Sequence, residues 1–560
     1  MKELLFTIGI SFFCVHLLAQ SCLSQGDTLT SQGQVDSFMI LYPGCKVVEG
    51  NLWITGTAIN NLIGLTSIRE YKGYLTITQT GILDLQGLEN LQSARGLRFY
   101  SNDNLQSLKG LNSLKKIGSL VIDGNKNLEG VGQPISMPYV GEINISSSDK
   151  LKRISDILLI DTIYKSIFIY ANGSLQVLDG FQHLDSLFEL HISNNHQLQS
   201  IEGLLPVNQI GYLSIENNDK LKNLDGLDSL TAIKHFGSLE NCDSLNDILS
   251  LHNLKYVDGH FSIRFNNLLK NLDGLEQLQF INGSFQVGSN VALNSLAGLR
   301  SLGKVGSDFI IDGNYELLSL EGLTNLDSIL GSLMLLYLPK LGNLSSIDSI
   351  QFIGENLLFQ QLLTTTILPR FVFPLIINGN LTIQASLKLT SLNGLDKIKI
   401  IKGELQLLDN SLLQDINAID QINLDSLDSL KIISNSKLST CNTENICHYL
   451  FNGGGAVIDY NQTGCKSAKD VLSHCSVAIR YPPENPTFSV FPNPADEYLD
   501  VFSPDFKVIK IQIHDMAGCI ISNWTMEESR INISNLPYGI YYLAISNENS
   551  HGIHRIVKIR

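Results

Sequence analysis

Gly-Leu pairs recur at a nearly fixed interval through most of this 560-residue chain. Gly64, Gly87 and Gly110 are each 23 residues apart, and Gly298 and Gly322 are 24 apart. Longer gaps, such as the 72 residues from Gly322 to Gly394, are multiples of the same unit. The other marked positions are Gly180, Gly203, Gly226 and Gly274, with degenerate copies at Gly132, Asp156, Ser250, Ser346, Arg370 and Ala418. A repeat of this length suits one coil of a solenoid and is too short for a pair of helices.

One unit, "LKGLNSLKKIGSLVIDGNKNL", shows how each coil is built. Its segment Gly118–Ile122 alternates as a short strand, with Leu120 and Ile122 pointing inward and Val121 outward. The other leucines fall one to a bend and face the same interior. Since a single coil cannot bury its own leucines, we expect about sixteen coils to stack into a parallel β-solenoid with a continuous core. The fold class is therefore mainly β.

Asparagine recurs just after the strand of most units. Turn asparagines tolerate a left-handed backbone and can bond buried backbone groups. We therefore expect a structural ladder of stacked amides. Its members are Asn102, Asn125, Asn172, Asn195, Asn218, Asn266, Asn290, Asn314, Asn410 and Asn435.

The segments "LKKIGSLVIDGNKNLEGV" and "VVEGNLWITG" resemble the receptor L domain, a leucine-rich-repeat-like β-helix found in receptor ectodomains. The resemblance covers roughly residues 35–440. It implies a right-handed solenoid whose flat strand face binds partners, and it carries over no catalytic residue. This chain departs from the family by running about sixteen coils where each receptor domain has far fewer.

The first 21 residues have the form of a secretory signal peptide, with Lys2, an apolar run and small residues from Ala19 to Ser21. The alternatives are a lipoprotein modified at Cys22, whose preceding residues make a poor lipobox, and a retained anchor. The apolar run is short for a membrane span, which needs about 20 residues. We expect an exported mature chain without a membrane span. A formal net charge of −15 argues against nucleic acid as a partner.

Both open ends of a solenoid need a cap over the core. We place the solenoid with its N-terminal cap at residues 22–440, with Cys45 a candidate partner for Cys22. A cysteine-rich C-terminal cap follows at residues 441–476. Its four cysteines predict two disulfides in one of three pairings, since the chain is exported; a zinc site is the alternative. They are Cys441, Cys447, Cys465 and Cys475, while Cys242 is expected to be a buried thiol.

After a proline-rich linker at residues 477–487, residues 488–560 predict a small β-sandwich. This part resembles the C-terminal sorting domain of the bacterial type IX secretion system, except that Cys519 stands where the family has a basic residue. The resemblance implies export to the outer surface, with the type IX machinery as a partner and later removal of the domain. The matching residues are Pro492, Asn493, Pro494, Asp515, Gly518, Leu536, Gly539, Ile540, Tyr541 and Lys558.

The outward residue of the strand is usually polar, but it becomes Ile310, Met334 and Leu358 in three consecutive units, with Leu336 beside Met334. Stacked coils would join these side chains into an apolar strip, because neighbouring strands lie about 4.8 Å apart. Such strips mark partner surfaces. The alternative is that the loop at residues 360–374 covers the strip. We expect a protein or glycan ligand there.

The sequence contains no recognised catalytic motif, and it predicts no cofactor and no metal site. The predicted function is therefore non-enzymatic binding or adhesion at the cell surface. Two alternatives stay open. A β-helix polysaccharide lyase or hydrolase would show converging carboxylates with Lys or Arg on one face, and a passive surface-coat protein would show neither feature.

Overall fold

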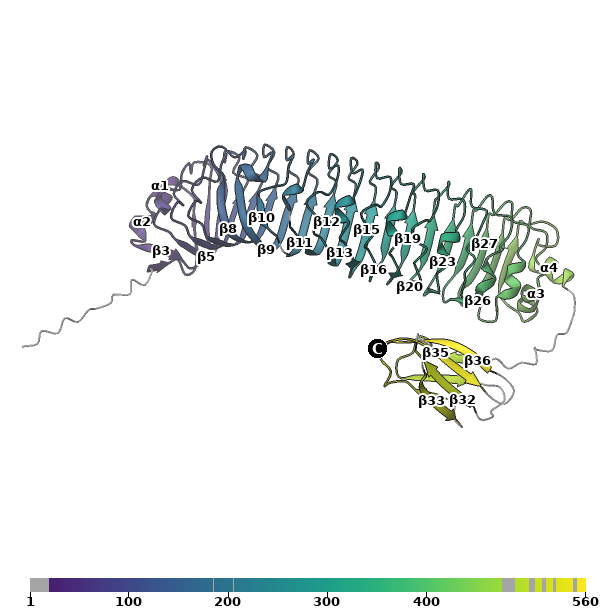
Figure 1. Cartoon of the computed structure of the whole chain (residues 1–560). Coiled ribbons are helices and arrows are strands. Elements are labelled where there is room, and N and C mark those ends of the chain that lie inside the picture. Colours follow the sequence, from purple (N-terminus) through teal and green to yellow (C-terminus); the bar gives the residue numbers. More distant parts are fainter. Residues whose placement is uncertain are drawn as a thin grey trace, which may run out of the picture. The chain divides into compact units, whose positions relative to one another are not determined.

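The computed structural model describes residues 20–184, 186–204, 206–475, 489–502, 509–515, 520–526, 530–546 and 551–559. The chain divides into two compact units, with the boundary after Cys475. Figure 1 shows the first unit as a gently bowed row of stacked coils, with short helices at its two ends. The predicted signal peptide, apart from its last two residues, and the predicted linker lie outside the described residues.

Each coil contributes a strand to one long parallel sheet. In β7 (Lys116–Asp123), Leu120 lies opposite Leu97 of the preceding coil and Ile143 of the following coil. Leu120 and Ile122 are fully buried and Val121 is half-buried, which confirms the predicted alternation. The solenoid has about 18 turns, two more than the glycine pattern marked, because strands before Gly64 and after Ala418 continue the same ladder.

The strands of the solenoid, in chain order, are β1 (Gln20–Cys22), β2 (Asp27–Leu29), β3 (Cys45–Val48), β4 (Leu52–Gly56), β5 (Glu70–Thr80), β6 (Ser93–Tyr100), β7, β8 (Ile135–Ser146), β9 (Leu158–Tyr170), β10 (Phe181–His183), β11 (Ser186–Ser193), β12 (Gln209–Glu216), β13 (Ala232–Glu240), β14 (Tyr256–Val257), β15 (His260–Arg264), β16 (Phe280–Ile281), β17 (Phe285–Gly288), β18 (Lys304–Val305), β19 (Phe309–Asp312), β20 (Ser328–Ile329), β21 (Leu333–Leu336), β22 (Phe352–Ile353), β23 (Leu357–Gln360), β24 (Leu375–Ile377), β25 (Leu381–Gln384), β26 (Ile398–Ile401), β27 (Glu404–Leu408), β28 (Ser429–Ile433) and β29 (Ala456–Asp459).

Short helices occupy the caps and some bends. The α-helices are α1 (Gln32–Asp36), α2 (Phe38–Leu41), α3 (Glu444–Phe451) and α4 (Ala468–His474). The 3-10 turns are η1 (Ile63–Leu65), η2 (Ile154–Asp156), η3 (Glu202–Leu204), η4 (Leu249–Leu251), η5 (Ala297–Leu299), η6 (Ser345–Ile347), η7 (Leu395–Lys397) and η8 (Asn417–Gln421).

The recurring glycine has a steric cause. Gly110 adopts a φ of +116°, a conformation that side chains disfavour. A Cβ atom there would also lie 1.9 Å from the carbonyl oxygen of Leu85 on the preceding coil. The bend therefore packs directly against backbone, and the leucine after it, Leu111, is fully buried. This close approach explains why the Gly-Leu pair marks the repeat.

The predicted asparagine ladder is present. All ten predicted side chains are fully buried. In a typical step, the amide oxygen of Asn290 accepts a hydrogen bond from the backbone N–H of Asn266 at 2.9 Å. Its amide nitrogen donates to the carbonyl of Ile263 at 2.8 Å. The ladder therefore satisfies buried backbone groups that the strand ladder leaves unpaired.

Both ends of the solenoid are closed by disulfide-linked caps. Cys22 pairs with Cys45 across β1 and β3 at the N-terminal end. At the other end, Cys441 pairs with Cys465 and Cys447 with Cys475, which resolves the three pairings that the sequence left open. Strand β29 lies between α3 and α4 in the chain, and it pairs in parallel with β28. The C-terminal cap thus contains the last rung of the sheet.

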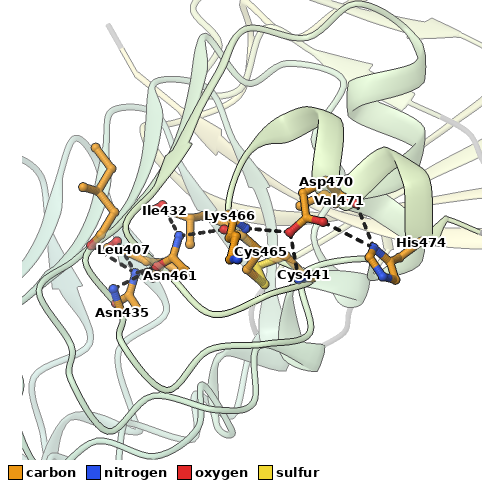
Figure 2. The surroundings of a disulfide bond; sticks show 12 residues. Leu407, Ile432, Asn435, Cys441, Asn461, Cys465, Lys466, Asp470, Val471 and His474 are labelled. Atoms are coloured by element: carbon orange, nitrogen blue, oxygen red, sulfur yellow. Dashed lines mark hydrogen bonds and ion pairs between the residues drawn. A yellow bond between two sulfur atoms is a disulfide. The ribbon is translucent and has the colours of Figure 1, made fainter.

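Figure 2 shows how the C-terminal cap joins the asparagine ladder. The amide oxygen of Asn461 accepts from the backbone N–H of Asn435 at 2.8 Å. Its amide nitrogen donates to the carbonyls of Ile432 and of Cys465, at 2.8 Å and 3.0 Å. The half-cystine Cys465 is therefore tied to the last coil by both its sulfur and its backbone.

The second unit is a small antiparallel β structure with its own core. One sheet has the order β30-β31-β34 and the other the order β33-β32-β35-β36. Leu499, Ile513 and Leu543 are among its buried residues. The strands are β30 (Ser489–Phe491), β31 (Tyr498–Phe502), β32 (Ile509–His514), β33 (Ile520–Met526), β34 (Arg530–Asn532), β35 (Gly539–Ser546) and β36 (His551–Lys558).

Candidate functional site

The three outward apolar residues predicted to form a strip do lie in register. Ile310 of β19 is opposite Met334 of β21, and Met334 is opposite Leu358 of β23. In the same row, polar Gln286 precedes Ile310 and Thr382 follows Leu358. The apolar strip, defined here as Ile310, Met334 and Leu358 with Leu336 beside them, is therefore bounded by polar residues along the solenoid axis.

Leu336 widens the apolar strip by one residue. It lies opposite Asp312 on one side and Gln360 on the other. All four side chains of the strip are half-buried, because neighbours one coil away cover part of each side chain. The strip is thus a partly shielded apolar band on the sheet face.

The loop at residues 360–374 forms part of the next coil. Leu362, Leu368 and Phe371 are all buried in the solenoid core, while Val372 and Phe373 are exposed. The inward side chains follow the repeat pattern, as in the other bends.

A group of aromatic side chains on the sheet was missed by the sequence reasoning. Tyr164, Phe188, Tyr212 and Phe236 are 47%, 58%, 39% and 36% exposed, on the successive strands β9, β11, β12 and β13. The rings of Phe188 and Tyr212 are 5.5 Å apart, edge to face. They lie nearer the start of each strand than the outward row that defined the apolar strip. A search of the other outward rows for aromatic residues would have found them.

Three further outward aromatic residues, Tyr100, Phe168 and Tyr170, lie on β6 and β9. Phe168 and Tyr170 lie on β9, and His191 of β11 approaches both rings, at 6.4 Å and 6.5 Å. Tyr100 is opposite Asp123 on β7, three coils away from Tyr170. Phe168 and Tyr170 therefore extend the exposed aromatic group, and Tyr100 stands apart from it.

The cysteine cap has the bonding of a structural element. All four of its sulfurs are engaged in disulfides, so none is a free thiolate that could bind zinc. In the described part of the chain, no three His, Cys, Asp or Glu side chains come together as a metal site would require. The thiol of Cys242 is buried, as expected.

The predicted sorting residues come from both ends of the second unit, and several of them meet. The side-chain amide of Asn493 donates to the carbonyl of Arg555 at 2.6 Å and accepts from the N–H of Val557 at 2.8 Å. This places Pro492 and Pro494 beside β36. Lys558 lies opposite Gly539 in the β35–β36 pair and is 5% exposed.

The remaining sorting residues are spread over the unit. The hydroxyl of Tyr541 donates to the carbonyl of Pro537 at 2.7 Å, which closes the turn before β35. Leu536 is buried and Ile540 lies opposite Val557. Asp515 follows β32, and Gly518 and Cys519 lie outside the described residues.

Comparison with known proteins agrees with these two units. Residues 44–137 match the family model of the receptor L domain, and residues 489–559 match that of the secretion system C-terminal sorting domain. Among solved structures, the chain is similar to a leucine-rich repeat protein from Bacteroides ovatus at 14% identity. That match covers 63% of this chain and 83% of the other, with a TM-score of 0.20. No curated protein matches the chain.

The sorting domain fixes the route that the protein takes. A type IX sorting domain at the C-terminus directs a chain to the cell surface or into the medium, so this protein is exported. Among the described helices, none is long and apolar enough to span a membrane.

Proposed function

We propose that this exported protein, built from a receptor-L-domain-like solenoid and a type IX sorting domain, is a non-enzymatic binding or adhesion protein. It recognises an extracellular protein or glycan through the sheet face of the solenoid. The observation that carries the proposal is the apolar strip. Three consecutive coils place Ile310, Met334 and Leu358 in one outward row, where the flanking coils carry Gln286 and Thr382.

Inward and outward apolar residues contribute differently to the stability of a solenoid. An inward leucine is buried by stacking, whereas an outward apolar side chain gains little from folding and lowers solubility. A contiguous outward band is therefore typical of a contact surface. Burying such side chains under a partner is favourable by about 25 cal/mol per Å² of apolar area.

The experiment compares the purified exported chain with a double variant, Met334→Ser with Leu358→Ser, on protein and glycan arrays. The proposal predicts that ligands bound by the native chain are lost or at least tenfold weaker with the variant, at about 1.4 kcal/mol per tenfold. The matched control is Gln406→Ser, in the same row two coils beyond Leu358. Undiminished binding by the double variant would remove the strip from the proposal.

The two alternatives give different results in the same preparation. A lyase or hydrolase would release unsaturated products or reducing ends from acidic polysaccharides. A passive coat protein would show neither turnover nor a ligand that depends on the strip.

A further inference from the structure

The exposed aromatic group lies on a part of the sheet that is also acidic. We define the aromatic–acidic face as the outward residues of β8 to β13 around Tyr212. Its aromatic members are Tyr164, Phe168, Tyr170, Phe188, Tyr212 and Phe236, and its carboxylates are Glu142, Glu189, Glu216 and Glu240. It is separate from the apolar strip, which begins at β19.

The register brings aromatic rings and carboxylates next to one another within the face. Tyr212 lies opposite Glu189 on one side and Phe236 on the other. A column is defined here as the set of residues that lie opposite one another on successive strands. In the column two outward positions after that of Tyr212, Glu216 lies opposite Glu240. Like charges opposite each other on adjacent strands are destabilising. Because Arg264 lies opposite Glu240 on its other side, a bound positive charge would relieve this repulsion mainly at Glu216.

The basic side chains of this face lie in its corner columns, beside Tyr164 and Phe188. The outward residues that share the columns of Glu189, His191 and Ser193 on β8 to β13 include no Lys or Arg. Lys165 and Lys234 lie at the corner before these columns. The ammonium of Lys234 bonds the hydroxyl of Tyr256 at 3.1 Å and Asp258 at 3.4 Å. Arg264, opposite Glu240, is the last residue of β15 in the next coil.

The chemistry of this face selects one class of partner. Aromatic rings attract cations placed over them, and carboxylates bind guanidinium and ammonium groups through charge-assisted hydrogen bonds. Charge complementarity of this kind sets partner choice and association rate. An extended chain has a rise of about 3.3 Å per residue, so about seven residues would span the coils of this face, which are spaced about 4.8 Å apart.

We propose that the aromatic–acidic face binds an extended, Arg- or Lys-rich peptide segment of a partner protein. This second surface is independent of the apolar strip and does not rest on it. Arginine suits the face best, because its planar guanidinium both stacks on rings and forms paired hydrogen bonds with carboxylates.

The experiment measures binding of a fluorescent 12-residue Arg-Ser alternating peptide to the full exported chain by anisotropy, at low and high salt. We expect saturable binding that weakens as salt rises, and no comparable binding of the Gln-Ser analogue. Two variants test the face. Tyr212→Ser with Phe236→Ser, and Glu189→Gln with Glu216→Gln, should each weaken binding at least about tenfold.

The controls separate this face from general acidity and from the apolar strip. Tyr315→Ser, at an exposed tyrosine outside the face, and the Met334→Ser/Leu358→Ser variant should both leave peptide binding unchanged. Equal binding by the glutamine variants or by the Gln-Ser peptide would overturn the proposal. Binding of neutral oligosaccharides in place of the peptide, lost in the Tyr212→Ser/Phe236→Ser variant, would overturn it in favour of a glycan site.

Discussion

The side chain of Asn218 joins two coils by bonding the backbone of the preceding coil at Asn195 and at Ile192. Its amide oxygen accepts from the N–H of Asn195 at 3.1 Å. Its amide nitrogen donates to the carbonyl of Ile192 at 2.9 Å, within the strand that precedes Asn195. Both side chains are fully buried, so each asparagine stabilises the coil before its own.

The first prediction concerns loss of one amide from this ladder. Asn290→Ala removes the acceptor for the N–H of Asn266 and the donor for the carbonyl of Ile263. Each buried group left unpaired costs about 1–3 kcal/mol, so we expect a loss of about 2–4 kcal/mol. Urea denaturation of the variant measures it. The control Asn267→Ala, at an exposed amide, should change stability by less than about 0.5 kcal/mol.

The second prediction concerns the one ladder position that holds a thiol. The thiol of Cys242, a weak donor, donates to the carbonyls of Ile215 at 3.9 Å and Glu240 at 3.5 Å, while the N–H of Cys242 donates to Asn266 at 3.1 Å. Cys242→Asn should restore the amide step and stabilise the protein by about 1 kcal/mol. Thermal or urea unfolding tests this, with Cys242→Ala as the comparison. A less stable asparagine variant would show that the pocket around residue 242 is too small for an amide.

The third prediction is that the thiol of Cys242 does not react in the folded protein. Burial raises the pKa of this thiol from 9.0 to about 12, so almost no thiolate forms at pH 8. Maleimide labelling of Cys242, followed on its own peptide by mass spectrometry, should therefore be absent under native conditions and complete in denaturant. Because the folded pKa is raised, this group destabilises the fold as pH rises from about 9 towards 12. Cys242→Ala should remove that part of the alkaline loss.

The fourth prediction concerns the C-terminal cap. The double variant Cys447→Ala with Cys475→Ala removes a disulfide between residues 28 positions apart. This should lower the free energy of unfolding by about 2–4 kcal/mol. The loss of stability should begin at the last coils, because α3 and α4 shield the open end of the solenoid there. Hydrogen exchange should therefore show faster exchange from β27 to β29, with β7 to β13 unchanged. Uniform acceleration along the solenoid would contradict a local role for the cap.

The fifth prediction concerns acid stability at Asp470 in the same cap (Figure 2). Its carboxylate accepts from the N–H groups of Lys466 at 3.0 Å and Gly464 at 2.8 Å, and these bonds lower the pKa of Asp470 below 3.8. A carboxyl group whose pKa is lower in the folded than in the unfolded state stabilises the fold at pH values above its unfolded pKa. This stabilisation is lost as the pH falls through its folded pKa. Asp470→Asn should therefore lower the melting temperature of the cap at pH 7 and make little difference near pH 2. An equal effect at both values would contradict this linkage.

Much of the solenoid could be predicted because its contacts repeat with the chain. Leu120 contacts residues one coil away, at a fixed separation in sequence, so the period alone predicts its neighbours. The register of Ile310, Met334 and Leu358 followed from the same rule. The two ends of the solenoid do not follow the repeat as closely. Strand β29, inside the C-terminal cap, adds a rung to the parallel sheet beyond the last marked position of the repeat.

The sequence by itself determined the repeat, the inward residues and the asparagine ladder, because each depends on contacts between positions about 24 residues apart. Only the tertiary structure decided which cysteines pair and which outward rings come together. It also placed Asn493 beside the last strand of the second unit, 64 residues away from Val557. These contacts depend on how the chain bends at corners and caps, and no periodic spacing encodes those bends.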